Sequence, residues 1–231
     1  MPNSVTFTAA QLTGQTDSHL AQQRVDNCQI HQQVLPVYQA LQNAAARAGF
    51  KLCAVSGFRG FSQQLQIWNN KFNGIRPILD ANSQPLDTKQ LSDEEKVFAI
   101  LRWSMLPGAS RHHWGTEIDV CDSLSLPNDY QLQLIPQEYD AGGYLAEFTQ
   151  WLDTNLTKYG FFKPYQQDLG GVAREPWHIS FKRVADSAQQ QHDLAQITAT
   201  IQAADIAGKA AILANIETIY QRYIINIYQD K

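Results

Sequence analysis

The sequence predicts an α+β chain, in which amphipathic helices alternate with short strands. Residues 30–48 place apolar side chains at helical spacing, and residues 50–55 then have the pattern of a short buried strand. A second long helical pattern, over 143–159, separates two further strand patterns at 117–120 and 177–181. Helices before and between short strands are compatible with an α+β fold, although periodicity alone selects no single architecture within that class.

The segments between these elements are loops and shorter helices. Residues 56–61 are predicted to form a turn that leads into a helix over 62–72. Residues 73–90 contain glycine, two prolines and several polar residues without periodicity, which predicts a long surface excursion that could cover a site. The SDEE sequence that follows is typical of a capping box and predicts a helix over 92–105.

No internal repeat and no low-complexity linker divides the chain. The simplest partition is therefore one domain over 1–183, with a helical C-terminal appendage over 184–231 that packs on it. This appendage is rich in alanine, glutamine and isoleucine and is predicted to form one or two helices. The appendage carries an apolar stripe that comprises Ile212, Ile216, Ile219, Tyr223 and Ile227. This stripe is expected to pack in the core rather than to bind a partner, with dimerisation left open.

Composition excludes several classes of partner. The chain has 231 residues, 44% of them hydrophobic, and a formal net charge of −4 without a basic stripe, which argues against a nucleic-acid partner and against attraction to a membrane surface.

The N-terminus lacks signal-peptide character and no segment reaches transmembrane length, so a cytoplasmic location is expected, or a periplasmic one if a signal has been removed. The three cysteines are expected to be reduced, half-buried thiols: Cys28, Cys53 and Cys121.

The residues that could carry chemistry are histidines and acids in glycine-bounded segments. A catalytic zinc ion commonly takes three nitrogen or carboxylate ligands and leaves one position for water. His112, from a loop, Asp119, from the following strand, and His178, from a second strand that could pair beside it, would make such a set. Glu175 in the EPWH sequence is the natural general base, because Pro176 bends the chain there.

Each of these residues also has a plain structural explanation. A histidine near a strand is more often a hydrogen-bonded structural residue than a ligand. Asp119 could point outward to water, and Glu175 could merely cap a turn. The adjacent His113 is expected to face solvent or to support the site from behind. A serine hydrolase built on Ser110 is disfavoured because no GxSxG elbow is present.

Three motifs together carry a family resemblance. SRHHWGTEID at 110–119 and EPWH at 175–178 closely resemble the signature of the VanY-type D-alanyl-D-alanine carboxypeptidases, in the zinc peptidase superfamily that includes the LAS enzymes and the hedgehog fold. SGFRGFSQQ at 56–64 resembles the upstream substrate-binding element of the same family. The resemblance implies that residues 1–183 form a zinc D,D-carboxypeptidase-like domain, with a small, mainly antiparallel sheet that carries the zinc ligands among surrounding helices.

The resemblance also implies roles for individual residues. The Zn²⁺ ligands would be His112, Asp119 and His178, and Glu175 would be the catalytic base. Arg59 would receive the terminal carboxylate of a peptidoglycan-type peptide, which suits its planar fork of donors.

Two further residues, Gln64 and Ser110, would help to orient the peptide end. Three positions depart from the family pattern: Phe58 replaces a frequent tyrosine, Gly60 replaces a serine or threonine, and Glu117 replaces a small residue. Glu117 shares a strand face with Asp119 at period two, so it could tune the charge at the metal or take part in binding.

The implied reaction is zinc-dependent hydrolysis of the terminal bond in a D-Ala-terminated peptide. A second possibility keeps the same centre but acts as an L,D-carboxypeptidase or a D,D-dipeptidase on cytoplasmic wall precursors or recycled fragments. A third is a zinc-containing module that binds wall peptides without cutting them, which the pairing of Glu175 with Arg59 disfavours. The sequence leaves the native metal and the oligomeric state open.

Overall fold

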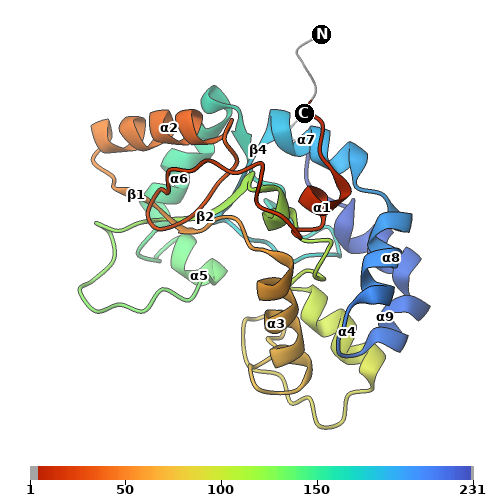
Figure 1. Cartoon of the computed structure of the whole chain (residues 1–231). Helices are drawn as coiled ribbons and strands as arrows, with labels where there is room; N and C mark the ends of the chain where they lie inside the picture. The colour runs from red at the N-terminus through yellow and green to blue at the C-terminus, as the bar shows by residue number, and fades with distance from the viewer. Residues whose placement is uncertain (1–4, 230–231) are drawn as a thin grey trace.

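The computed structural model describes residues 5–229, which form a four-stranded sheet with helices around it (Figure 1). The strand order is β1-β2-β4-β3, and each neighbouring pair is antiparallel. The strands are β1 (Leu52–Ser56), β2 (Glu117–Asp122), β3 (Phe161–Phe162) and β4 (His178–Phe181). The predicted α+β class with a small antiparallel sheet is therefore confirmed.

Helices account for most of the remaining regular structure. Those before β4 are α1 (Ala9–Leu12), α2 (Leu35–Arg47), α3 (Phe61–Phe72), α4 (Asp93–Leu101), the 3₁₀ helix η1 (Arg111–Trp114), α5 (Pro136–Tyr139), α6 (Ala146–Asn155) and the 3₁₀ helix η2 (Leu156–Tyr159). Those after β4 are α7 (Lys182–Gln191), α8 (Leu194–Ala203), α9 (Lys209–Ala214), α10 (Ile216–Ile219) and the π-helical turn η3 (Tyr220–Ile224). Within residues 5–229, no helix has both the length and the apolar character that crossing a membrane requires.

The first long helix begins later than its apolar spacing predicts. It starts at Leu35 rather than at residue 30, with Pro36 in its first turn, where the missing amide hydrogen costs no intrahelical bond. The preceding residues are held by other parts of the chain: the Ala21 amide donates to the Ile30 carbonyl, and the His31 amide donates to the Gly115 carbonyl. These long-range bonds keep the segment out of the helix.

Helix α4 begins as predicted but ends early. The Ser92 side chain accepts from the Glu95 amide and the Glu95 side chain accepts from the Ser92 amide, which confirms the capping box. The helix ends at Leu101 rather than near residue 105, and in the turn that follows the amides of Trp103 and Ser104 both donate to the Ile100 carbonyl. This early end frees the following residues to line a cleft.

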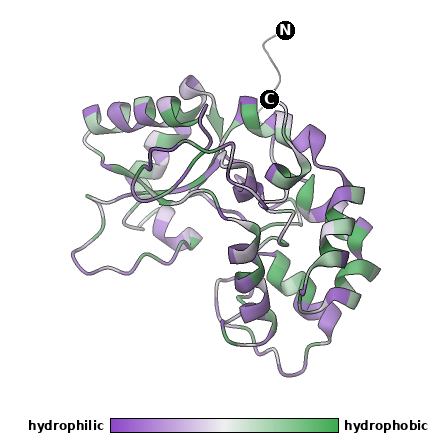
Figure 2. Ribbon diagram, viewed as in Figure 1, coloured by the Kyte–Doolittle hydropathy of each residue, from purple (hydrophilic) through white to green (hydrophobic). Residues whose placement is uncertain are grey.

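The described residues form two apolar cores. One joins α2 and α6 to the sheet and includes Tyr38, Val120, Phe148 and Ile179. The other joins α3 and α4 to the C-terminal helices and includes Trp68, Ile100, Ile197 and Ile212. In Figure 1 these two helical groups lie apart, with α3 and α4 beside α8 and α9, and Figure 2 shows mixed hydrophobic and hydrophilic residues along α2.

The C-terminal segment contains more helices than its composition predicts. The expectation of one or two helices is wrong, since α7 to α10 and η3 fall within it. Asp193 starts α8 by accepting a hydrogen bond from the Gln196 amide, and Gly208, with φ at 73°, allows the chain to turn before α9. Four members of the apolar stripe are buried and Ile216 packs partly buried against the same core, which confirms the core-packing interpretation.

The segment over 73–90 lacks regular helices, as predicted, but part of it lies in the interior. Ile78 is buried, and an isolated bridge pairs Leu79 with Pro85. The Asp80 carbonyl accepts a hydrogen bond from the Trp103 indole, 3.1 Å away. Because Trp103 lines the cleft described below, this excursion supports one wall of the cleft from behind.

Candidate metal centre and cleft

The sheet register brings two of the predicted site residues together. On the antiparallel pair β2 and β4, Asp119 lies directly opposite His178. His112 reaches them from η1, which immediately precedes β2, so it lies on a short helix rather than on the expected loop. One potential ligand atom from each of the three residues lies within 4.8 Å of the others.

The two imidazole rings are oriented by different hydrogen-bond acceptors. His112 Nδ1 lies 2.7 Å from the Gly57 carbonyl oxygen, which leaves Nε2 facing Asp119 at 3.5 Å. His178 Nε2 lies 2.8 Å from a Glu117 carboxylate oxygen, which leaves Nδ1 facing Asp119 at 3.2 Å. Each ring therefore turns one nitrogen toward the same point.

The donor set fits a divalent metal. Asp119 Oδ1 and His178 Nδ1 are buried, lie 3.2 Å apart and make no well-aligned hydrogen bond, which is costly for polar atoms unless a further group binds there. Two imidazoles and one carboxylate are a common set for zinc, with one position left open. The three residues thus form a candidate metal centre.

The charge states of the three residues in the centre depend on one another. Burial and the neighbouring Arg59 lower the pKa of His112 to about 3, so its ring is neutral. Burial opposes ionisation of Asp119, but His112, His178 and Arg59 outweigh it and hold the pKa of Asp119 below its ordinary value. Burial also opposes charge on His178, yet three surrounding carboxylates outweigh that effect and raise its pKa. A metal cation bound at the centre would take the place of the proton that the raised pKa of His178 implies.

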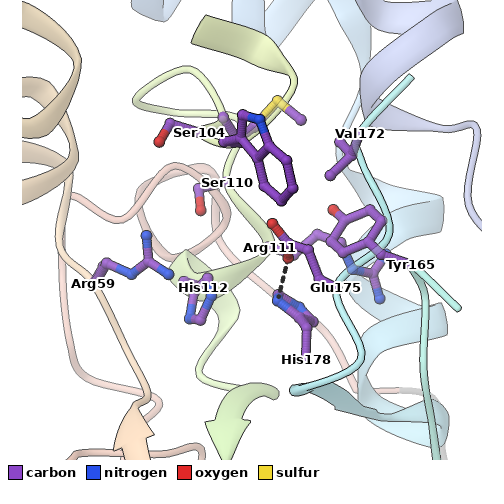
Figure 3. Close-up of a pocket in the computed structure, with 11 residues that line it drawn as sticks. Arg59, Ser104, Ser110, Arg111, His112, Tyr165, Val172, Glu175 and His178 are labelled. Carbon is purple, nitrogen blue, oxygen red and sulfur yellow. Dashed lines mark ion pairs between the residues drawn. The ribbon is translucent and has the colours of Figure 1, made fainter. Parts of the chain in front are cut away.

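Glu175 approaches the same point from the segment before β4. Its Oε2 atom lies 3.2 Å from His178 Nδ1, the ion pair drawn in Figure 3. The His178 amide donates to the Glu175 carbonyl, so the EPWH sequence forms a tight turn, which contains the bend predicted at Pro176. Burial raises the pKa of the Glu175 carboxyl, which suits a group that must both accept and return a proton.

Arg59 lies on the opposite side of the centre, in the connection between β1 and α3. Its Nη2 atom lies 3.3 Å from Asp119 Oδ2, and its Nη1 atom donates to Gln64 Oε1 at 3.3 Å. Gln64 is fully buried, and its Nε2 atom donates to the Met105 carbonyl at 2.7 Å. The structure therefore brings Gln64 to Arg59 rather than to the cleft surface.

The cleft collects residues from three segments that lie far apart in the sequence (Figure 3). They are Arg59, then Trp103, Ser104, Met105, Ser110, Arg111 and His112, and finally Tyr165, Val172, Glu175 and His178. Ser110 is thus in the cleft wall. Trp103 and Tyr165 were not identified from the sequence, because no motif contains them and only the fold brings their segments together. Arg111 lies inside the motif at 110–119, but at a position to which the resemblance assigns no role.

His113 is buried, so the expectation that it could face solvent is wrong. Its Nδ1 atom lies 2.6 Å from the Arg59 carbonyl oxygen, and its Nε2 atom accepts from the Gly108 amide at 2.9 Å. Because it lies in the η1 helix, its ring points away from that of His112 toward the backbone that carries Arg59. His113 therefore supports the site from behind, which is the other role expected for it.

Of the two departures before α3, the structure explains Phe58 and gives no local reason for Gly60. The Phe58 ring packs edge-on against His19, with ring centroids 5.7 Å apart, so its apolar face is used in packing. Gly60 precedes α3 with extended backbone, where an added Cβ atom would meet only ordinary contacts. The cysteines are free thiols; Cys28 and Cys53 are half-buried as expected, whereas Cys121 is buried.

Comparison with known proteins identifies the family. A family model described as "VanY: D-alanyl-D-alanine carboxypeptidase" matches residues 27–184. An uncharacterised protein of Haemophilus influenzae is 38% identical over 122 residues, covering 52% of this chain and 93% of that protein.

Solved structures share the fold. VanYB in complex with D-alanine-D-alanine is similar with a TM-score of 0.53 and 22% identity, covering 77% of this chain and 84% of that one. A mutant of the vancomycin resistance D,D-pentapeptidase VanY in complex with Zn(II) has a TM-score of 0.53 and 21% identity, covering 86% and 91%. With the family model spanning more than half of its residues, the chain belongs to the VanY D-alanyl-D-alanine carboxypeptidase family.

Proposed function

We propose that this protein is a zinc-dependent D-alanyl-D-alanine carboxypeptidase that hydrolyses the terminal peptide bond of peptidoglycan-type peptides. The observation that carries the proposal is the placement of Glu175 and Arg59 on two sides of one centre, beside His178 and Asp119 respectively. A carboxypeptidase needs both a base near the metal and a cation for the free carboxylate. Membership of the family supports the same peptide class.

His112, Asp119 and His178 would hold the metal, and a Zn(II)-bound structural neighbour supports zinc as that metal. A zinc ion held there would supply Lewis acidity toward the scissile carbonyl and toward a water molecule. Since Nε2 of His112 and Nδ1 of His178 both face Asp119, the ligand atoms need no rotation of either ring.

The chain's own residues would bind the peptide end and move the proton. The Arg59 guanidinium is held by Gln64 and Asp119 and lines the cleft, so it can pair with the terminal carboxylate and favour terminal bonds over internal ones. The Glu175 carboxylate accepts a proton from the attacking water and returns it to the amine of the departing D-amino acid. Ser110 lies in the cleft wall, where it would help to orient the peptide.

The test replaces the base while keeping its size. Glu175→Gln is expected to bind zinc in the same stoichiometry as the wild type and to lose about 10²- to 10⁴-fold in kcat, as loss of general acid–base catalysis predicts. Metal content of the purified protein and mass spectrometry of digested muropeptides measure the two properties separately. Undiminished turnover in this variant would remove Glu175 from the mechanism, and absence of metal from the wild type would remove the zinc centre.

The same digestion separates related activities. A pentapeptide that loses one D-alanine indicates the D,D-carboxypeptidase, whereas a shortened tetrapeptide indicates an L,D-carboxypeptidase and cleavage of free D-Ala-D-Ala indicates a D,D-dipeptidase. A protein that binds these peptides and zinc without any product is the non-catalytic module. The buried base beside His178 favours an enzyme over that module, because binding alone needs no proton acceptor there.

A further inference from the structure

Glu117 is a fully buried carboxylate with no assigned role in the proposed reaction. Its Oε1 atom accepts hydrogen bonds from Ser180 Oγ at 2.7 Å and from Thr116 Oγ1 at 3.0 Å. Its Oε2 atom lies 2.8 Å from His178 Nε2, on the side of the ring away from the candidate metal centre. Glu117 thus contacts a proposed metal ligand without itself belonging to the group of ligands.

The sheet register explains this contact. Glu117 lies opposite Ser180, and Asp119 lies opposite His178, on the same antiparallel pair of strands. Side chains two residues apart on a strand share a face, so the two carboxylates of β2 lie on the same side of the sheet. The His178 ring spans the distance between them, with Nδ1 facing Asp119 and Nε2 facing Glu117.

Arg111 compensates the charge of Glu117. Its Nη2 atom lies 3.1 Å from Glu117 Oε1 and also donates to Ser180 Oγ, while its Nη1 atom donates to Gln189 Oε1 from α7 at 2.8 Å. The guanidinium also lies over the Trp114 ring, 4.7 Å from its centroid. An unpaired buried carboxylate would be strongly destabilising, so this anchored cation lets Glu117 remain ionised in the interior.

We propose that Glu117 is a positioning residue for the metal centre, held in place by Arg111 and Ser180. By accepting a hydrogen bond from Nε2–H of His178 it fixes the tautomer that leaves Nδ1 free to bind metal, and it increases the basicity of Nδ1. His112 has only the neutral Gly57 carbonyl in the equivalent position, so the two histidines are supported unequally. This inference rests on the proposed metal site.

The first test measures metal affinity rather than turnover. Glu117→Gln keeps the size of the side chain and removes its charge, and is expected to weaken zinc binding by about 10- to 100-fold in competition with a chromophoric chelator. The matched control is Glu138→Gln. Glu138 is also buried and accepts bonds from Tyr130 and from the amides of Gln133 and Ile135, outside the cleft, so its variant should bind zinc within about twofold of the wild type.

Three results of this competition would overturn a proposal. Unchanged zinc affinity in Glu117→Gln would reject the positioning role and leave the metal site intact. Equal losses in both variants would reject it as well, since general destabilisation would then explain the effect. No zinc binding by the wild type would instead reject the proposed function.

The second test uses the wild type and so does not depend on the folding of any variant. In protein labelled with ¹⁵N-histidine and loaded with ¹¹³Cd²⁺, the metal is expected to couple to Nδ1 of His178 and to Nε2 of His112. The remaining proton of the His178 ring should then be on Nε2, next to Glu117. Coupling of cadmium to His178 Nε2, or an Nε2 atom without a proton, would overturn the inference.

Discussion

Replacing His31 with asparagine tests how the buried histidines respond to acid. His31 is 1% exposed and packs against the rings of Phe7 and His19, with centroids 5.7 and 5.8 Å away. Its Nδ1 atom accepts a hydrogen bond from the Gln33 amide at 3.1 Å, a bond that an asparagine oxygen could also accept. Burial, with smaller contributions from His19 and Arg183, lowers the pKa of His31 to about 4.

The sign and size of the effect follow from this pKa. Between pH 4 and the ordinary histidine pKa of about 6.5, the unfolded chain binds a proton that folded His31 does not. The free energy of unfolding therefore falls as the pH falls through this window. At 1.36 kcal/mol per unit, His31 alone accounts for a loss of about 2 kcal/mol between pH 8 and pH 5.

Urea denaturation between pH 5 and pH 8, with a chelator present throughout, measures this loss. The decline in stability for His31→Asn should be about 2 kcal/mol smaller than for the wild type over this range. Leu41→Ala is the control, because Leu41 is fully buried and has no titrating group. It should lower stability by about 2–5 kcal/mol at every pH and leave the slope unchanged. Parallel curves for the wild type and His31→Asn would refute the reasoning.

Two further predictions concern substrate recognition and the C-terminal helices. Arg59→Lys should raise KM for D-Ala-terminated peptides and lower kcat/KM by about 10-fold or more. The reason is that lysine lacks the planar fork of donors that Gln64 and Asp119 hold in place. Unchanged steady-state kinetics would exclude a contact between Arg59 and the terminal carboxylate. Ile201 is fully buried in α8, so Ile201→Ala should lower the free energy of unfolding by about 2–5 kcal/mol while urea still unfolds the protein in a single transition. A separate early transition would contradict the proposal that residues 184–231 fold with 1–183 as one unit.

Local sequence patterns predicted the longer helices before β4 and three of the four strands, because the determinants of these elements are short in range. The Ser92 capping box and the left-handed Gly160 after η2 each depend on a few neighbouring residues. The start of α2 could not be predicted in this way, since residues 30 and 31 are held by the distant Ala21 and Gly115. The number of C-terminal helices depends on packing against α3 and α4, which no local pattern contains.

The candidate site shows the same division. The resemblance implied His112, Asp119, His178 and Glu175, and the fold brings these residues together, because the motifs that carry them are short and ordered. Trp103, which lines the cleft, was missed: its indole is held by a carbonyl in the excursion over 73–90, a contact that depends on tertiary structure alone.

The position of Glu117 could be predicted from the sequence only in part. Period two alone predicts that it shares a face with Asp119, but the same rule is satisfied whether the carboxylate binds the metal, binds substrate or packs elsewhere. Its position relative to the ring depends on the register that sets Asp119 opposite His178, and its charge depends on Arg111 reaching it from η1. Removing that arginine would take the guanidinium partner from a buried carboxylate, and the loss of one partner of a buried ion pair costs about 3–5 kcal/mol. A glutamate in place of a small residue is therefore compatible with this fold only as part of a group that includes Arg111 and Ser180.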